Sequence, residues 1–431
     1  MRNGGSSAFE RRPWMGIYIQ GRRVELSIAV GLLLALSLSR RLGPSGPLLV
    51  GAVGLALWFL RPELRERLSN QIRENHARLW LHMGLWHCAI VGRSGRIPKV
   101  VRSAKIPVGY RFLVSLPMGL HFAVMKNRAP ELAAALGVRE VRVKVIPQNA
   151  RYVEIVVIRS NAFPREFASP LTKLHETSLW EPVYFGVGQD GLAVQIGLPE
   201  HNLLIGGEPG SGKSVALSTI IAAAALDPSV GLTLLDGKQV ELAAWADVAD
   251  RFVGADQDEA VAALEGLRQI MDFRYQVLAA TRQRKITRAQ NEGLHLLVVD
   301  ELAFYLRGGK KETRDRFAEL LRDLVSRGRA AGIIVVAATQ KPSHEVVPTW
   351  IRDLFSFRLA MRCTSTDASD TILGQGWAQQ GFSASTIDPS TRGIGYLLAE
   401  GGVPVLIMTP YLSDEEIDSL ADRALRLRTS S

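Results

Sequence analysis

Residues 203–214 read Leu-Leu-Ile-Gly-Gly-Glu-Pro-Gly-Ser-Gly-Lys-Ser, and this stretch decides the fold class. From Gly207 to Ser214 it matches G-x-x-x-x-G-K-S/T, the pattern of a loop that binds phosphates. An apolar run precedes the loop and the alanine-rich segment 215–226 follows it, so the loop should join a strand to a helix. The motif requires this context, and the combination predicts an α/β fold.

The loop residues predict how a nucleoside triphosphate is held. Glycines allow backbone N–H groups to turn toward the phosphates at the positive end of a helix. Lys213 would reach the β- and γ-phosphates, and the Ser214 hydroxyl would bind Mg²⁺. We therefore expect ATP and Mg²⁺ as cofactors, with the nucleotide contacted by Gly207, Glu208, Pro209, Gly210, Ser211, Gly212, Lys213 and Ser214.

A second motif should complete the site, because P-loop ATPases place acids at the end of a neighbouring apolar strand. Residues 294–301 read Leu-His-Leu-Leu-Val-Val-Asp-Glu. Asp300 would hold the hydrated Mg²⁺, and Glu301 would polarise the attacking water as the catalytic base. The alternative is a strand that merely ends in solvated acids, and the upstream loop favours the catalytic interpretation.

The two motifs are separated by 85 residues, which is too many for one crossover connection. We expect a strand at 231–235 and a long helix at about 257–284 within this interval. These elements imply an additional strand between the two nucleotide-binding strands, which is the order of RecA-like motors.

Another strand, expected after the second motif, ends in polar residues. We expect a helix at 313–329 and then a strand at 333–338 that ends in Thr339 and Gln340. Gln340 at this tip is the candidate that senses the γ-phosphate or positions the water. The alternative is an ordinary turn at a strand end.

The positive charge of the chain is concentrated in its N-terminal part. The net charge is +10, and residues 1–96, with 14 arginines and 5 acids, carry +9 of it. Basic composition is therefore no argument for nucleic-acid binding by the remaining residues. The only two cysteines, Cys88 and Cys363, lie far apart in the sequence, which excludes a disulfide scaffold and a cysteine-based zinc site.

Two apolar runs, at 24–39 and 48–60, predict a transmembrane hairpin. The first spans about 24 Å as a helix, slightly less than a hydrocarbon core, and snorkelling arginines or local thinning can make up the difference. Arginines cluster before the first run and after the second, so the positive-inside rule places both ends in the cytoplasm. We expect a multi-pass protein of the inner (cytoplasmic) membrane with its motor in the cytoplasm. The alternative is a buried helical hairpin of a soluble domain.

The segment between the apolar runs and the loop predicts a charged helix and then a small α+β domain. We expect the helix at 62–88, strands at 110–116 and 151–158, and a short helix at 129–136. The predicted division is a cytoplasmic tail, two transmembrane helices, a helical connector, an α+β domain with a linker, a P-loop motor, and a C-terminal helix and tail, at 1–23, 24–61, 62–96, 97–180, 181–415 and 416–431.

Several stretches together resemble the FtsK/SpoIIIE family of DNA-pumping ATPases. Besides the two nucleotide motifs, the similar stretches are 236–242, 327–333 (Arg-Gly-Arg-Ala-Ala-Gly-Ile), 338–343 (Ala-Thr-Gln-Lys-Pro-Ser), 364–365 and 370–376. Residues 97–160 are similar to the α domain of the family. The resemblance covers about 97–415 and implies a RecA-like P-loop motor preceded by this small domain.

The family resemblance also implies an assembly and a partner. In this family a hexameric ring threads double-stranded DNA and holds ATP between subunits. By this resemblance Arg329 is the candidate arginine that acts on the neighbouring subunit's ATP; the alternatives are Arg327, or a helix-end arginine that complements the helix dipole. The segments 282–288 and 307–311 are candidates for contacts to DNA phosphates, and such contacts carry no sequence information.

The function that the resemblance implies is that of a membrane-anchored, ATP-dependent double-stranded DNA translocase. Residues 236–238 read Asp-Gly-Lys where chromosome pumps usually have Asp-Pro-Lys, and no sequence-reading domain is visible. These features are similar to the FtsK-like plasmid transfer (Tra) proteins of actinobacteria, so conjugative plasmid transfer is the expected task. The alternatives are a chromosome-segregation pump, an FtsK-like protein-secretion ATPase, and a nucleotide-dependent scaffold.

Overall fold

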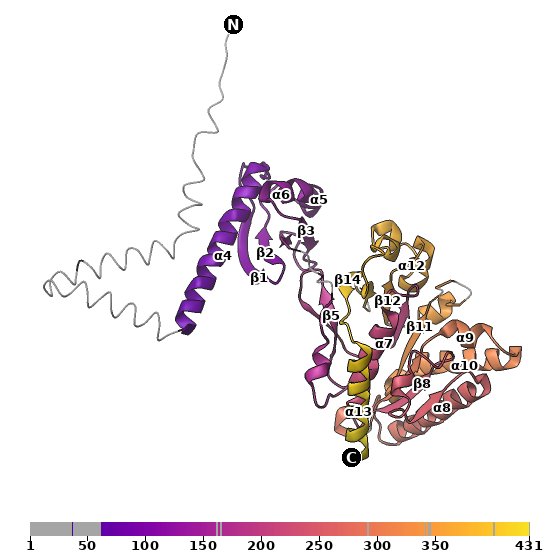
Figure 1. Ribbon diagram of the computed structural model, residues 1–431. Helices are drawn as coiled ribbons and strands as arrows, with labels where there is room; N and C mark the ends of the chain where they lie inside the picture. Colours follow the sequence, from indigo (N-terminus) through magenta and orange to yellow (C-terminus); the bar gives the residue numbers. More distant parts are fainter. Residues whose placement is uncertain are drawn as a thin grey trace, which may run out of the picture. The chain divides into compact units, whose positions relative to one another are not determined.

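The computed structural model describes Ser37 and residues 62–160, 163, 166–290, 293–340, 342–343, 346–399 and 401–430. The chain divides into two compact units, Met1–Ala162 and Phe163–Ser431 (Figure 1). Both predicted transmembrane runs lie outside the described residues, apart from Ser37. Among the helices that are described, none combines the length and the apolar character needed to cross a membrane.

The first unit is an antiparallel sheet covered by helices. Its strands pair in the order β1-β2-β4-β3, and its helices are α4, α5 and α6. Leu81 and Leu85 of α4 are buried in one cluster with Phe112 and Ile155 of the sheet, so the helix predicted as a connector belongs to the core of this unit. Gly137 ends α6 with a φ of +63°, as expected of a glycine C-cap. The elements are α4 (Pro62–His87), β1 (Lys99–Ile106), β2 (Gly109–Ser115), α5 (Phe122–Asn127), α6 (Ala129–Leu136), β3 (Glu140–Val145) and β4 (Tyr152–Ile158).

The second unit is built on a ten-stranded mixed sheet with the order β6-β5-β14-β13-β12-β7-β11-β10-β8-β9. The strands from β12 to β9 in this order are parallel, and β13, β14, β5 and β6 extend the sheet in antiparallel fashion. The strands are β5 (Val183–Gly188), β6 (Ala193–Ile196), β7 (Leu203–Gly206), β8 (Gly231–Leu235), β9 (Arg251–Val253), β10 (His295–Val299), β11 (Ile333–Thr339), β12 (Phe357–Met361), β13 (Ile394–Leu398) and β14 (Val405–Met408).

Helices cover both faces of the parallel part of this sheet (Figure 1). Leu203 and Ile205 of β7 pack in one core with α7 and α13, whereas Leu204 packs in a second core with α8 and α10. Because strands buried on both faces read as continuous apolar runs, β7 and β11 lack the alternation of a half-exposed strand. The helices are α7 (Lys213–Ala225), α8 (Gln257–Ala280), α9 (Leu302–Arg307), α10 (Lys311–Arg327), α11 (Thr349–Arg352), α12 (Thr366–Leu373) and α13 (Asp414–Ser430), with short 3₁₀ turns at Pro170–Lys173, Ala243–Trp245, Arg288–Gln290, Gly328–Ala331, Ala378–Gln380 and Ala384–Thr386.

One strand separates the two nucleotide-binding strands β7 and β10, as the sequence predicts, but it is a different strand from the one expected. The intervening strand is β11, and β8, the predicted strand at 231–235, lies on the far side of β10. After β7 the chain forms β8, three positions away in the sheet. The two positions between them are taken later in the sequence by β10 and β11. As a result the tip of β11 lies beside the phosphate-binding loop, where the Thr339 carbonyl accepts a hydrogen bond from the Gly207 N–H at 3.2 Å.

Two segments that the sequence places at the margins of the motor pack against its α7 helix. Leu171 and Leu179 are buried in the core of the second unit, although the linker was predicted to extend to residue 180. At the other end of the chain, the Arg428 guanidinium of α13 donates hydrogen bonds to the carbonyls of Ala224, Ala225, Asp227 and Val230. The second unit therefore starts before β5 and includes the C-terminal helix.

Candidate nucleotide-binding site

The phosphate-binding loop lies between the end of β7 and the start of α7. Gly210 and Gly212 have φ values of +76° and +105°, which glycine adopts without steric cost. A Cβ atom on Gly212 would lie 2.7 Å from the Gly393 nitrogen, so this position needs glycine for space as well. The Gly393 N–H donates a 2.8 Å hydrogen bond to the Ser211 carbonyl. The loop is therefore anchored to the segment before β13.

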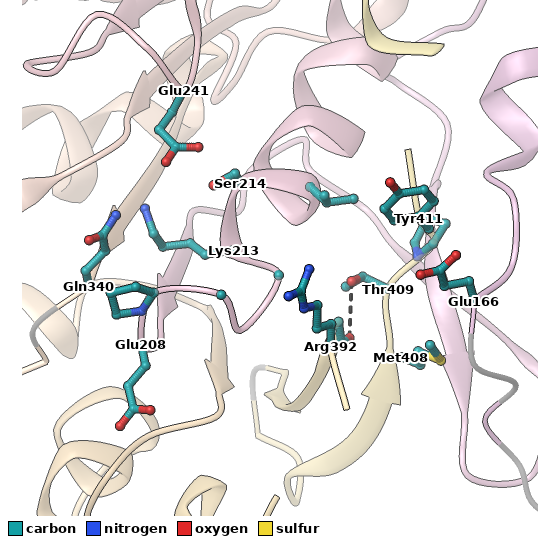
Figure 2. Close-up of a pocket in the computed structure, with 16 residues that line it drawn as sticks. Glu166, Glu208, Lys213, Ser214, Glu241, Gln340, Arg392, Met408, Thr409 and Tyr411 are labelled. Atoms are coloured by element: carbon teal, nitrogen blue, oxygen red, sulfur yellow. Dashed lines mark hydrogen bonds between the residues drawn. The ribbon is translucent and has the colours of Figure 1, made fainter. Parts of the chain in front are cut away.

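A cavity of about 280 Å³ opens at this loop. Figure 2 shows Lys213 and Ser214 near its middle, with Gln340 and Glu241 to one side and Tyr411 to the other. Six of the eight predicted nucleotide-binding residues line the cavity, and Gly207 and Ser211 do not. The lining residues are Glu166, Glu208, Pro209, Gly210, Gly212, Lys213, Ser214, Val215, Glu241, Gln340, Arg392, Gly393, Met408, Thr409, Pro410 and Tyr411.

Lys213 and Asp300 form a buried ion pair below the loop. The Lys213 Nζ lies 2.8 Å from Asp300 Oδ1 and 3.3 Å from the Asp300 carbonyl oxygen. The two residues are 3% and 0% exposed. Burial raises the pKa of Asp300, and the Lys213 ammonium opposes that rise. The lysine therefore favours the charged form of the carboxylate, against the effect of burial.

Two buried oxygens beside this pair fit a triphosphate with its Mg²⁺. Asp300 Oδ2 and Ser211 Oγ have no hydrogen-bond partner among the described residues. Buried polar atoms are normally paired, so these two oxygens are suited to contact a bound triphosphate and its ion. Oxygen donors are the ligands that Mg²⁺ prefers, and Ser214 supplies a further hydroxyl in the cavity. Ser214 and Asp300 are the residues that would hold the hydrated ion.

Glu301 is held by three hydrogen bonds at the tip of β11 and the start of α9. Its carboxylate accepts from Thr339 Oγ1 at 2.8 Å, from the Gln340 N–H at 2.9 Å and from the Ala303 N–H at 3.2 Å. Its side chain is only 8% exposed. A carboxylate offers about four acceptor positions, so Oε2, which accepts only from Gln340, can still contact a water molecule. The position of this carboxylate is thus coupled to β11.

Gln340 links this carboxylate to the cavity. Its backbone N–H contacts Glu301, and its side chain lines the cavity. Directly after β8, which pairs with β10, the buried Asp236 carboxylate accepts four backbone hydrogen bonds, from the N–H groups of Lys238, Gln239, Val240 and Leu242 at 2.8–3.1 Å. These bonds shape the loop that carries Glu241 into the cavity.

Comparison with known proteins agrees with this geometry. Residues 180–307 match the family model described as FtsK/SpoIIIE family. The chain carries an FtsK/SpoIIIE domain. It is 26% identical over 356 residues to the DNA translocase FtsK of Haemophilus influenzae, covering 73% of this chain and 65% of that protein. It is 27% identical over 355 residues to the DNA translocase FtsK of Bacillus cereus, covering 77% and 43%. The chain thus spans about two fifths to two thirds of the length of these relatives.

Solved structures show the same fold. The conjugation coupling protein TcpA of pCW3, in its monomer form with ATPgS, has a TM-score of 0.55 and 20% identity, covering 82% of this chain and 99% of that chain. ATPases 2 and 3 of EssC from Geobacillus thermodenitrificans have a TM-score of 0.51 and 15% identity, covering 62% and 52%. The fold and the loop of the FtsK/SpoIIIE domain are those of a P-loop ATPase.

The two candidate trans-acting arginines of the FtsK/SpoIIIE domain have different surroundings. The Arg327 guanidinium pairs with Asp323 at 2.9 Å and Asp272 at 3.0 Å and lies over the ring of Tyr275. Arg329 is half-buried, and in the described part of the chain its side chain has no hydrogen bond or ion pair. The Arg327 guanidinium is thus engaged by side chains of this chain, whereas in the described part of the chain the Arg329 guanidinium is not.

Both candidate arginines lie at the edge of the sheet opposite the nucleotide. They precede β11, whose far end carries Thr339 and Gln340. The seven residues of this strand span about 20 Å. The Arg329 side chain therefore cannot reach the cavity of its own subunit.

The two segments predicted to contact DNA lie at opposite ends of the strands. Segment 282–288 is tied to the start of β11 through the Ile286 N–H, which donates to the Ala330 carbonyl. Within this segment Lys285 pairs with Glu200, and Arg288 pairs with Glu181. Segment 307–311 follows α9, at the edge of the sheet where the phosphate-binding loop lies.

Several residues that line the cavity are not predicted from the sequence. Arg392 is exposed and, in Figure 2, its guanidinium is directed into the cavity, where a cation suits a triphosphate. Glu166, Thr409 and Tyr411 also line it. These residues belong to no motif of fixed spacing. The signal that could have drawn attention to Arg392 is its position between Thr391 and Gly393, just before an apolar strand.

Proposed function

We propose that this chain is a membrane-anchored, Mg²⁺- and ATP-dependent translocase of double-stranded DNA that works as a hexameric ring and moves plasmid DNA between cells. The observation that carries the proposal is the coupling at the cavity of the FtsK/SpoIIIE domain. There the buried pair of Lys213 and Asp300 lies next to Glu301, whose carboxylate is bonded to the tip of β11. Such coupling is what a motor needs in order to convert hydrolysis into movement.

The Lys213–Asp300 ion pair and the unpaired oxygens of Asp300 and Ser211 indicate how a triphosphate would bind. A triphosphate at the loop competes with Asp300 for the Lys213 ammonium, so binding would draw the lysine toward the phosphates. Both oxygens of Asp300 then become available for water molecules around the metal. Bound Mg²⁺ would neutralise charge on the phosphates. Ser214 holds its hydroxyl at the start of α7, where such an ion is contacted.

Glu301 supplies the proton-accepting step. A water molecule that attacks the γ-phosphate must lose a proton, and the Glu301 carboxylate is the acceptor. The carboxylate that takes this proton also accepts hydrogen bonds from the Gln340 N–H and the Thr339 hydroxyl, so its protonation would weaken these bonds. Gln340, whose side chain lines the cavity, thereby relays the state of the phosphate to β11.

The ring arrangement is supported by the position of Arg329. This side chain lies about 20 Å along β11 from the cavity of its own subunit. An arginine that stabilises transition-state charge must touch the phosphates, so Arg329 would serve a neighbouring subunit. Each subunit would then hydrolyse ATP only when a neighbouring subunit supplies its arginine.

The cargo and the membrane anchor are supported from outside the site. The relatives from Haemophilus influenzae and Bacillus cereus are named DNA translocases, and TcpA is named a conjugation coupling protein. The apolar runs at 24–39 and 48–60, with their flanking arginines, support anchoring in the inner membrane with the motor in the cytoplasm. Chromosome segregation would use the same motor chemistry. An FtsK-like protein-secretion ATPase is the rival of a different class.

The test is ATP hydrolysis by the full chain in mild detergent, with and without linear double-stranded DNA, at low and moderate salt. Lys213→Ala serves as the blank. We expect strong stimulation by DNA that weakens as salt rises, because contacts to phosphates release counterions. Hydrolysis that is indifferent to DNA in preparations where native mass measurement shows rings would refute the pump, and stimulation by a secreted peptide instead would favour the secretion ATPase.

A further inference from the structure

The cavity continues past the phosphate-binding loop to an end that the nucleotide motifs do not explain. Met408, Thr409, Pro410 and Tyr411 line this end together with Glu166. Figure 2 shows Tyr411, Met408 and Glu166 on the opposite side of the loop from the group that contains Gln340 and Glu241. These five residues are called the 408–411 end below, with Glu166 included.

The orientation of a bound triphosphate follows from the two ends. Its phosphates lie on the loop at Lys213, and Gln340, through its bond to Glu301, marks the side of the terminal phosphate. The ribose and base must then extend in the other direction, which leads to the 408–411 end.

The 408–411 end is connected to the phosphate-binding loop by backbone hydrogen bonds. The Gly393 N–H donates to the Ser211 carbonyl at 2.8 Å, and the Thr409 N–H donates to the Gly393 carbonyl at 2.8 Å. The Tyr411 N–H donates to the Phe167 carbonyl at 2.9 Å, which places Glu166 beside it. The walls at this end are therefore positioned relative to the loop before a ligand enters.

The side chains at this end suit a nucleobase. Tyr411 is 45% exposed, and within the described residues no aromatic ring packs against it. Met408 is buried next to it, so the wall combines an open aromatic face with a thioether. Glu166 is exposed, and in the described part of the chain its carboxylate has no hydrogen bond or ion pair. A carboxylate accepts hydrogen bonds and donates none, so it favours a base edge that presents an amino group.

We propose that Met408–Tyr411 and Glu166 form the nucleobase subsite, in which the Tyr411 ring stacks on adenine and the Glu166 carboxylate accepts a hydrogen bond from its 6-amino group. Guanine carries an oxygen at that position, which the carboxylate repels. The inference rests on the proposed function in one respect, namely that the cavity binds ATP.

The test compares nucleotide affinities of the full chain, measured by displacement of a fluorescent ATP analogue. Tyr411→Ala should weaken ATP binding about ten-fold, whereas Tyr411→Phe, which keeps the ring, should stay within about two-fold. Wild-type protein should bind ATP about five-fold more tightly than purine riboside triphosphate, which lacks only the 6-amino group. In Glu166→Ala the two nucleotides should bind equally. Tripolyphosphate, which has no base, should bind all of these proteins alike.

Matched controls come from the same unit. Glu176→Ala removes an exposed carboxylate ten residues from Glu166 that does not line the cavity, and Val405→Ala trims an exposed side chain on β14. Both should leave every affinity unchanged. If Tyr411→Ala fails to fold, the ratio of the two affinities in Glu166→Ala decides alone.

The outcomes separate the subsite from the proposed function. Wild-type protein that binds ATP, with Tyr411→Ala and Glu166→Ala showing unaltered affinities and ratios, overturns the subsite and leaves the ATPase standing. Wild-type protein that binds neither ATP nor tripolyphosphate overturns both. Equal affinity for ATP and GTP in wild-type protein overturns the assignment of Glu166 to the 6-amino group.

Discussion

At the scale of single residues, the site combines a closed ion pair with a carboxylate that is already engaged. Lys213 and Asp300 neutralise each other in a buried position, and the Glu301 carboxylate accepts three hydrogen bonds from residues of β11 and α9 and from the residue after β11. The Lys213 ammonium can contact phosphate oxygens only when a triphosphate competes with Asp300 for it. The arrangement therefore favours hydrolysis only when nucleotide is bound, and substitutions at these residues should separate binding from turnover.

Glu301→Gln should block turnover while preserving ATP binding. The amide keeps the size of the side chain and one acceptor oxygen for the β11 tip, but it cannot accept a proton from water. We expect kcat to fall by about two to four orders of magnitude, with the Kd for ATP within about three-fold of wild type. Single-turnover hydrolysis and ATP binding are the measurements, and Glu312→Gln on the exposed start of α10 is the control. A kcat within ten-fold of wild type would show that Glu301 is not the base.

Asp300→Asn should destabilise the nucleotide-free protein more than Lys213→Met does. The first change leaves a lysine ammonium in a site that is 3% exposed with no counter-charge, and breaking a buried pair in this way costs about 3–5 kcal/mol. In the second, Asp300 can take up a proton, because burial already raises its pKa. Urea unfolding at neutral pH, followed by fluorescence, tests the order of the two variants. The reverse order would mean that the pair contributes little to holding the loop.

At the scale of elements, the C-terminal helix α13 stabilises the helix that carries the nucleotide. Arg428 donates to the carbonyls of Ala224 and Ala225 at the C-terminal end of α7, where helical carbonyls lack partners within the helix, and to two carbonyls of the loop that follows. Cations at this end also interact favourably with the helix dipole. We expect Arg428→Ala to lower the free energy of unfolding by about 2–3 kcal/mol, and Arg284→Ala, an exposed arginine after α8, to change it by less than about 0.5 kcal/mol. Equal effects in urea unfolding would show that α13 contributes no more than a surface charge.

The start of β10 should make the fold sensitive to mild acid. Burial lowers the pKa of His295 to about 4, with smaller contributions from Asp250, which raises it, and from Arg274 and Arg428, which lower it. Its Nε2 lies 3.0 Å from Thr233 Oγ1 on β8. Because the unfolded chain has a histidine pKa of about 6.5, it binds more protons than the folded chain between pH 6.5 and 4, and stability falls as pH drops through that window.

The size of this effect can be measured with a substitution that removes the titration. Between pH 7.5 and pH 5.0 the wild-type protein should lose about 2 kcal/mol more than His295→Gln, whose amide can still bond Thr233. Urea unfolding at the two pH values gives both numbers. Identical losses in the two proteins would mean that the pKa of His295 does not differ between the folded and unfolded states.

Local signals explain which elements the sequence predicts. The phosphate-binding loop, the acids after β10 and helices such as α6 and α10 are encoded by short motifs, caps and periodicity, and the structure has them within a few residues of the predicted bounds. The order of the strands in the sheet is not encoded locally, because the pairing of β11 with β7 and β10 depends on residues far apart in the sequence. Glu166 and Tyr411 were not predicted for the same reason, because an isolated bridge between residues 168 and 411, far apart in the sequence, brings their segments together.

At the scale of the whole molecule, the proposed ring would add an arginine to the cavity of each chain. Its own Arg329 lies at the other end of β11, and Arg327 is occupied by Asp323 and Asp272. A ring would supply the missing arginine from a neighbour, so subunits with complementary defects should repair one another. This property distinguishes a trans-acting arginine from one that only supports the fold.

Mixing Lys213→Ala and Arg329→Ala subunits should therefore recover activity that neither has alone. Lys213→Ala destroys its own site but can still present Arg329, and Arg329→Ala keeps its own site but cannot assist its neighbour. With equal amounts and random assembly, about one quarter of the interfaces pair an intact site with an intact arginine, so DNA-stimulated hydrolysis should recover to roughly that fraction of wild type. Arg327→Ala in place of Arg329→Ala is the matched comparison, and there we expect lower stability, because two acids and the Tyr275 ring lose their cation. Recovery with Arg327→Ala and none with Arg329→Ala would reassign the trans-acting role to Arg327. If neither mixture recovers activity although mixed rings form, no arginine of this segment crosses the interface.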